Sequence, residues 1–258
     1  LPSDEAVIGM LNELQKIGAK GNLKPGRYFQ NLLSELTHPN DEVAAGVAAS
    51  LGSWQYREGG EDLLNALNDK GRSSNVRSAA AVSLAQLGQT QYVNELKALA
   101  ESGDIETRYH AVTGLAVADM DDAKVAVASV LSEDPGKADP VALVQSFTKI
   151  RRGDGILADA LTDVAIHPKV MSAVATFHRQ TGQLPNRLWE LFLEPTKAAL
   201  SALLLKQDRD KLTFDVDRYG VAARGEMIFR RPEVACISCH GIGSVGPTLG
   251  PNLVAVGT

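Results

Sequence analysis

The sequence predicts an all-α protein, with paired helices repeated over most of its length and a shorter segment at the C-terminal end. Alanine and leucine dominate the apolar positions, and aromatic residues make up only 5% of the chain. This composition favours helices over sheets. Apolar residues also recur in register at an interval of about thirty residues, which is typical of a stack of structural repeats.

One set of predicted helices supplies this register. Their large core positions lie at successive spacings of 33, 31, 32 and 30 residues, and a mostly smaller residue lies four positions before each one. Residues four apart share a helix face, so these helices are expected to stack side by side. The helices are 41–54, 74–87, 106–118, 139–150 and 169–180, with large positions Leu51, Leu84, Leu115, Phe147 and Phe177 and preceding positions Val47, Ala80, Ala111, Leu143 and Ala173.

Second apolar segments alternate with these helices at 63–67, 93–99, 123–131 and 156–166, separated by polar and glycine-rich breaks. Two helices in about 32 residues, with Val76-Arg77 before an alanine-rich run, resemble the short bacterial kind of HEAT repeat. The resemblance covers about residues 5 to 200 and implies a HEAT/armadillo-like α-α superhelix, assigned here as a domain of residues 1–205. Segments 188–193 and 195–205 are expected to close the stack. Such solenoids usually serve as protein-binding scaffolds.

The strongest functional motif is Cys236-Ile237-Ser238-Cys239-His240, which contains both cysteines of the chain. Two thiols one helical turn apart, followed by an imidazole, form the arrangement that attaches a c-type haem. Cys236 and Cys239 would each bind one vinyl group, and His240 would ligate the iron. A redox dithiol and half of a zinc site are the alternatives, but the sequence predicts no strand-helix alternation here and contains no second cysteine pair.

The residues around this motif resemble the class I cytochrome c fold. The resemblance rests on Gly250-Pro251-Asn252-Leu253 after the motif and on Arg224-Gly225 with Phe229 before it. The resemblance implies that the Pro251 carbonyl accepts a hydrogen bond from His240 and that Leu253 packs on the haem face. Gly246-Pro247 competes with Pro251 for this role. The resemblance to class I cytochromes c also implies that residues 222–229 form the first helix of the domain.

The given sequence ends at Thr258, before the closing helix of that fold, so residues 206–258 are expected to form a linker and the N-terminal part of a cytochrome c-like domain. No methionine follows His240 in this sequence, so the sixth iron ligand is not identified. The spacing of Met227 within its predicted helix favours core packing over a ligand role.

Other candidate sites have weaker support. Asp215-Val216-Asp217-Arg218-Tyr219-Gly220 with Glu226 matches most of a calcium-loop spacing, but Tyr219 stands where an oxygen ligand is needed, so a solvated linker is expected. His110 is expected to be a partly buried or surface residue of a repeat helix. The remaining histidines, His38, His167 and His178, have no metal-ligand spacing. The acidic residues Asp119, Asp121 and Asp122 are expected to cap a helix.

Together these motifs resemble a group of large bacterial multidomain haem-binding proteins. The leading hypothesis is an electron-transfer segment that carries haem c and is positioned by the repeats against a redox partner or a dehydrogenase domain, with no catalytic residue of its own. The alternative is a helical-repeat interaction scaffold whose haem motif is unoccupied. A net charge of −5 argues against a nucleic-acid partner, and no membrane span is expected.

Haem attachment implies a periplasmic or exported protein whose signal lies outside this sequence. A chain made in a cytoplasm without the attachment machinery is expected to be haem-free.

Overall fold

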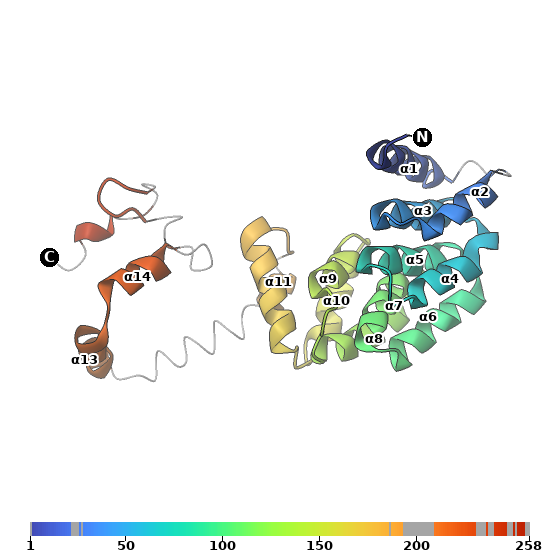
Figure 1. Cartoon of the computed structure of the whole chain (residues 1–258). Coiled ribbons are helices and arrows are strands. Elements are labelled where there is room, and N and C mark those ends of the chain that lie inside the picture. Colours follow the sequence, from blue (N-terminus) through green and yellow to red (C-terminus); the bar gives the residue numbers. More distant parts are fainter. Residues whose placement is uncertain are drawn as a thin grey trace. The chain divides into compact units, whose positions relative to one another are not determined.

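The structure is a computed structural model that describes residues 2–21, 26, 28–185, 187–192, 209–230, 236, 240–246, 250 and 252–255. Throughout this described part the regular elements are helices (Figure 1), as predicted, apart from one isolated bridge between Ile242 and Val245. The chain divides into two compact units, Leu1–His178 with Gly182–Leu193, and Arg179–Thr181 with Glu194–Thr258. The predicted domain boundary at 205/206 lies outside the described residues.

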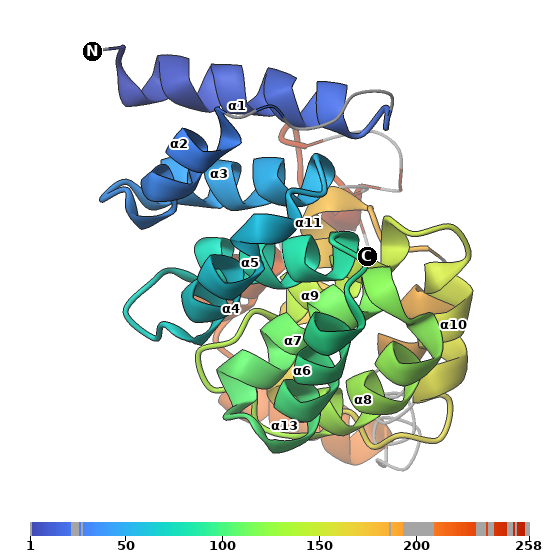
Figure 2. The same cartoon turned by 90° about the vertical axis from the view of Figure 1, so that its right-hand side faces the viewer.

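The first unit is a stack of helix pairs (Figure 2). One series of helices forms a continuous row in which each contacts the next, and the second helix of each pair packs beside that row. The row consists of α1 (Asp4–Gly18), α3 (Asp41–Ser53), α5 (Ser74–Gln86), α7 (Ile105–Ala118) and α9 (Pro140–Thr148). The accompanying helices are α4 (Gly60–Asn68), α6 (Thr90–Ser102), α8 (Met120–Ser132) and α10 (Gly153–Leu161), with α2 (Phe29–Ser34) and α11 (Pro168–Thr181) near the two ends.

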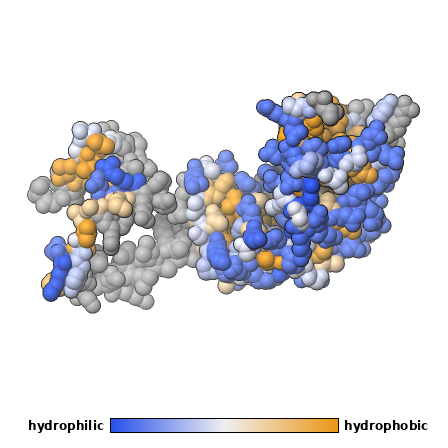
Figure 3. All heavy atoms as spheres, in the orientation of Figure 1, coloured by the Kyte–Doolittle hydropathy of each residue, from blue (hydrophilic) through white to orange (hydrophobic). Residues whose placement is uncertain are grey.

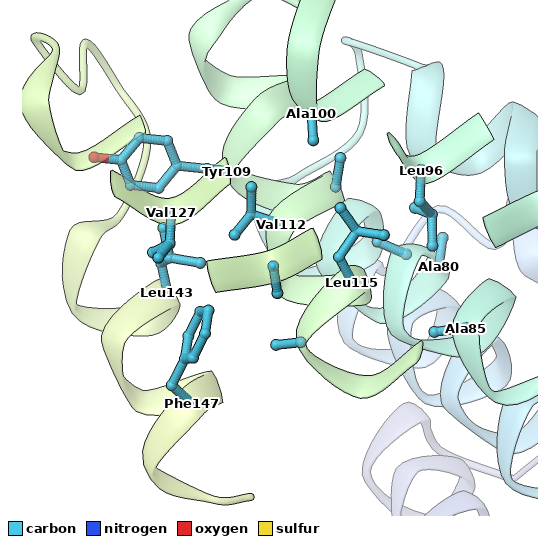
Figure 4. Packing of buried hydrophobic residues seen from close by; sticks show 14 of the residues in the cluster. Ala80, Ala85, Leu96, Ala100, Tyr109, Val112, Leu115, Val127, Leu143 and Phe147 are labelled. Carbon is cyan, nitrogen blue, oxygen red and sulfur yellow. The ribbon is translucent and has the colours of Figure 1, made fainter. Parts of the chain in front are cut away.

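The predicted register is confirmed in four of the five repeat helices. Leu51, Leu84, Leu115 and Phe147 are buried, and Figure 4 shows the last two among the side chains that fill the core. In α11 the prediction is wrong, because Phe177 is only half-buried and Val170 and Val174 are buried instead. Val170, Val174 and His178 are spaced by four and share one face of α11, and on that face the His178 ring lies 3.9 Å from the Trp189 ring between centroids.

Small residues let the helices of the row approach closely. A Cβ atom placed on Gly114 of α7 would lie 2.6 Å from the Ala81 carbonyl oxygen of α5. One placed on Gly52 of α3 would lie 2.7 Å from the Ser83 Cα of α5. Both distances are shorter than van der Waals contact, so any larger residue at these positions would push neighbouring repeats apart.

Two arginines 31 positions apart connect successive repeats. Arg77 donates from Nε to the Leu67 carbonyl of α4 (2.8 Å) and from Nη2 to the Thr107 hydroxyl of α7 (2.7 Å). Arg108 repeats the pattern one step on, donating from Nε to the Ala100 carbonyl of α6 (3.0 Å) and from Nη1 to Glu133 (2.8 Å). Each guanidinium therefore occupies a backbone acceptor near the end of the preceding helix. Arg77 also reaches α7 of the following repeat, whereas Arg108 reaches Glu133, the residue after α8.

Candidate functional site

The second unit contains the Cys-x-x-Cys-His motif. Of the five predicted site residues, Cys236, His240 and Leu253 are described, whereas Cys239 and Pro251 lie outside the described residues. The His240 amide donates to the Cys236 carbonyl across 3.0 Å. This bond joins the two described ends of the motif, which are four residues apart.

A tight turn follows directly after His240. The Ile242 amide donates to the Val245 carbonyl (2.8 Å), and the Val245 amide donates to the Ile242 carbonyl (3.2 Å). Gly246 completes the turn with a φ of 107°, and a Cβ atom there would lie 2.9 Å from the Gly241 Cα. Glycine is therefore required at this position on both conformational and steric grounds.

The structure brings the predicted Leu253 region to this turn. The short 3₁₀ helix η4 (Leu253–Ala255) begins there, and the Leu253 amide donates to the Gly241 carbonyl across 3.0 Å. The Asn252 side chain is bonded to the backbone of Gly243. The segment after the histidine and the segment that contains Leu253 thus form one local structure, although they are separated by about ten residues of chain.

Apolar side chains in the described part of this unit are largely exposed. Figure 3 shows several apolar residues at the surface of this unit, and none of the described residues from 209 to 255 belongs to the buried hydrophobic core. The exposed ones are Phe214, Val216, Tyr219, Val221, Met227, Val245 and Val254. Such a surface favours an apolar partner group. Cys236 and His240, one thiol and the imidazole of the donor set that a covalently attached haem would need, are among the described residues.

The segment 215–220 was expected to be a solvated linker. Its described side chains, 216–220, are exposed, but residues 215–219 belong to a helix that the spacing did not predict, α13 (Arg209–Tyr219). There the Arg218 guanidinium lies over the Phe214 ring, 5.6 Å from its centroid, as residues four apart on one helix face can. Met227 was expected in a core, yet its side chain is 61% exposed.

The helix expected over 222–229 is present as α14 (Ala222–Phe229). A Cβ atom on Gly225 would meet no atom within 4 Å, so within the described residues no close helix contact accounts for this glycine. The helix itself is confirmed, whereas the packing roles that the cytochrome resemblance implies for Gly225 and Phe229 remain predictions.

His110 lies deeper in the scaffold than expected. Its side chain is 4% exposed, and Nδ1 lies 2.8 Å from the Ser78 hydroxyl. Burial, followed by the nearby positive charge of Arg77, lowers the pKa of His110 to about 4. The imidazole is therefore neutral near pH 7 and acts as a structural link between α5 and α7, a role that isolated sequence spacing does not indicate.

A groove of about 310 Å³ lies between α6 and α8 with Leu115 of α7 in its lining. Lys97 in its lining is paired, because it lies 3.6 Å from Asp119 and also contacts Asp122. These bonds, chiefly the one to Asp122, raise the pKa of Lys97. Asp119 also caps α8 as predicted, accepting from the Asp121 amide (3.2 Å) and the Asp122 amide.

Comparison with known protein families matches residues 29–116 to HEAT repeats. No match to the chain was found among curated proteins or among solved structures. Within the part of the chain that the structure describes, no helix is long and apolar enough to cross a bilayer, and no three His, Cys, Asp or Glu side chains are grouped to hold a metal ion. The matched residues run from α2 into α7, so the first unit contains HEAT repeats, which generally present surfaces for protein partners.

Proposed function

We propose that the chain carries one covalently attached c-type haem and transfers electrons between protein partners, with the HEAT repeats as the scaffold. The observation that carries this proposal is the concentration of both cysteines of the chain in Cys236-x-x-Cys239-His240. The backbone bond from the His240 amide to the Cys236 carbonyl, which joins the two ends of the motif, is compatible with it.

Each residue of the motif has a defined role in the proposal. Cys236 and Cys239 form thioether bonds that fix the orientation of the porphyrin, and His240 supplies the axial nitrogen. Pro251 and Leu253 take the acceptor and packing roles that the resemblance to class I cytochromes c implies. The haem supplies reversible one-electron chemistry when bound, and the protein supplies attachment, orientation and partial exclusion of water.

The exposed apolar side chains of the second unit support the proposal. Phe214, Tyr219, Met227 and Val254 are each more than half exposed, whereas the first unit buries its apolar residues in a continuous core. A macrocycle attached at the motif would provide apolar surface of the kind that these segments do not provide for one another.

The proposed partner is a redox protein or a dehydrogenase domain that docks on the repeat scaffold. Repeat stacks present long surfaces for such docking. In this proposal the chain contributes no catalytic residue and works outside the cytoplasm, in the periplasm or after export, because covalent attachment of haem takes place there.

A second candidate function is a protein-interaction scaffold whose motif carries no haem. The match to HEAT repeats favours it, because such repeats act as interaction surfaces without any cofactor. The two candidates differ in one measurable property, the haem content of the matured protein.

The test is a pyridine haemochrome assay on the chain produced in a host with the c-type attachment machinery. The electron-transfer proposal expects one c-type haem per chain, lost in the double variant Cys236→Ser/Cys239→Ser. The control Ser238→Ala, which changes the motif without removing a thiol, is expected to retain it. A haem-free parent protein would support the second candidate, and an unchanged spectrum without the thiols would refute attachment of the haem at this motif.

A further inference from the structure

Asn252 makes more contacts than its exposed position suggests. The Gly243 amide donates to Asn252 Oδ1 (3.1 Å), and Asn252 Nδ2 donates to the Gly243 carbonyl (2.6 Å). The same Oδ1 accepts from the Val254 amide (3.1 Å). A carboxamide has one acceptor and two donor positions on a single plane, so it can bind the donor and the acceptor of one residue's backbone at the same time.

These bonds fix the alignment of two chain segments. With the bond from the Leu253 amide to the Gly241 carbonyl (3.0 Å), three hydrogen bonds connect the turn after the motif to the segment 252–254. Gly243 itself has a φ of 64°, which glycine adopts at little cost. Asn252 therefore recognises a specific turn conformation and does not simply contact a neighbouring loop.

His240 lies at the start of this fixed structure. On one side its amide is bonded to the Cys236 carbonyl (3.0 Å), and on the other the carbonyl of the next residue, Gly241, accepts from Leu253. The backbone on both sides of the imidazole is therefore held. A ligand side chain keeps one orientation only if the backbone that carries it is held in this way.

We propose that Asn252 is a positioning residue for His240, which acts by locking the turn 241–246 onto the segment 252–254. The proposal rests on the haem-binding function proposed above. Its structural part, the lock itself, is independent of that function and is testable in the haem-free chain.

The lock is tested by hydrogen exchange on the full haem-free chain. Asn252→Ala removes the three hydrogen bonds of this side chain. Exchange in peptides covering 241–246 is expected to accelerate about fivefold to tenfold, because exposed hydrogen bonds are partly replaced by bonds to water and the net effect is roughly that of one hydrogen bond. Asn252→Asp keeps an oxygen that can accept from the Gly243 and Val254 amides, but it places a second carboxylate oxygen against the Gly243 carbonyl, so a similar acceleration is expected. Asn94→Ala, an exposed asparagine of α6, is the matched control and leaves exchange in these peptides unchanged. Equal exchange in the parent and Asn252→Ala would overturn the proposal whatever the haem content.

The positioning role is tested in the matured protein. The parent is first shown to carry haem, and a haem-free parent would refute the proposed function and this role with it. With haem content matched, the ferric Asn252→Ala protein is expected to give a broadened or second electron paramagnetic resonance signal, because His240 no longer has one orientation. Asn94→Ala gives the parent spectrum. If Asn252→Ala does not mature, Asn252→Asp takes its place, with broadening expected for the same reason. A parent-like spectrum in the loaded Asn252 variant would disprove positioning while leaving haem binding intact.

Discussion

Gly114 provides the most direct test of how the repeats are held together. In Gly114→Ala, the new Cβ would lie 2.6 Å from the Ala81 carbonyl oxygen, 3.0 Å from the Ala81 carbonyl carbon and 3.1 Å from Leu96 Cδ1. The leucine methyl can rotate away, but the oxygen belongs to the backbone of α5. Helix α7 must therefore move away from α5 by several tenths of an ångström.

The expected loss follows from two opposing effects. Overpacking of a well-packed contact costs about 1–3 kcal/mol, whereas replacing a helical glycine by alanine contributes about 1 kcal/mol of stability. Because the obstructing oxygen is a backbone atom, the upper part of the overpacking range applies, about 2–3 kcal/mol, and the net destabilisation of Gly114→Ala is expected to be about 1–2 kcal/mol. Gly114→Val is expected to lose more because its branched side chain extends further towards α5. Gly9→Ala is the matched control, because its Cβ would meet nothing within 4 Å and only the helix-propensity gain of about 0.5–1 kcal/mol remains.

Urea unfolding followed by circular dichroism at 222 nm measures these differences, with the urea midpoint compared at constant slope. The change in unfolding free energy is expected to be negative for Gly114→Ala and positive for Gly9→Ala. If Gly114→Ala were as stable as the parent or more stable while Gly9→Ala was stabilised as expected, the close approach of α5 and α7 would be refuted.

Two further predictions concern buried polar groups of the scaffold. Arg77, whose side chain is 2% exposed, bonds to the Leu67 carbonyl and the Thr107 hydroxyl, so Arg77→Ala is expected to lose about 3 kcal/mol or more of unfolding free energy. Arg108→Ala, at the more exposed equivalent position, is expected to lose clearly less in the same urea titration, and equal losses would contradict a burial effect. The folded-state pKa of His110 is about 4, below the ordinary value of about 6.5, so the residue takes up a proton more readily in the unfolded chain. Its contribution to the free energy of unfolding is therefore fully present above pH 6.5 and falls by up to about 3 kcal/mol towards pH 4. His110→Gln is expected to remove this pH dependence, and an unchanged slope between pH 4 and 6.5 in the variant would show that another group causes it.

The local sequence determined the helical class, most helix positions and the motif. Helices α3, α5 and α7 lie within one residue of their predicted bounds, because alanine-rich periodic segments with capping residues define a helix from short-range interactions alone. The Cys-x-x-Cys-His motif is likewise visible in the sequence because its chemistry depends on spacing within five residues.

Tertiary structure decided the features that depend on distant neighbours. The sequence marked Val76-Arg77 as part of a repeat, but only packing shows that Arg77 is buried and joins α4 to α7. Only packing shows that α11 buries Val170 and Val174, whereas Phe177 is half-buried. The bonds between Asn252 and Gly243 join residues nine positions apart in the chain. Periodicity reports which residues share a face of one helix, whereas burial, hydrogen-bond partners and pKa depend on which other segment covers that face.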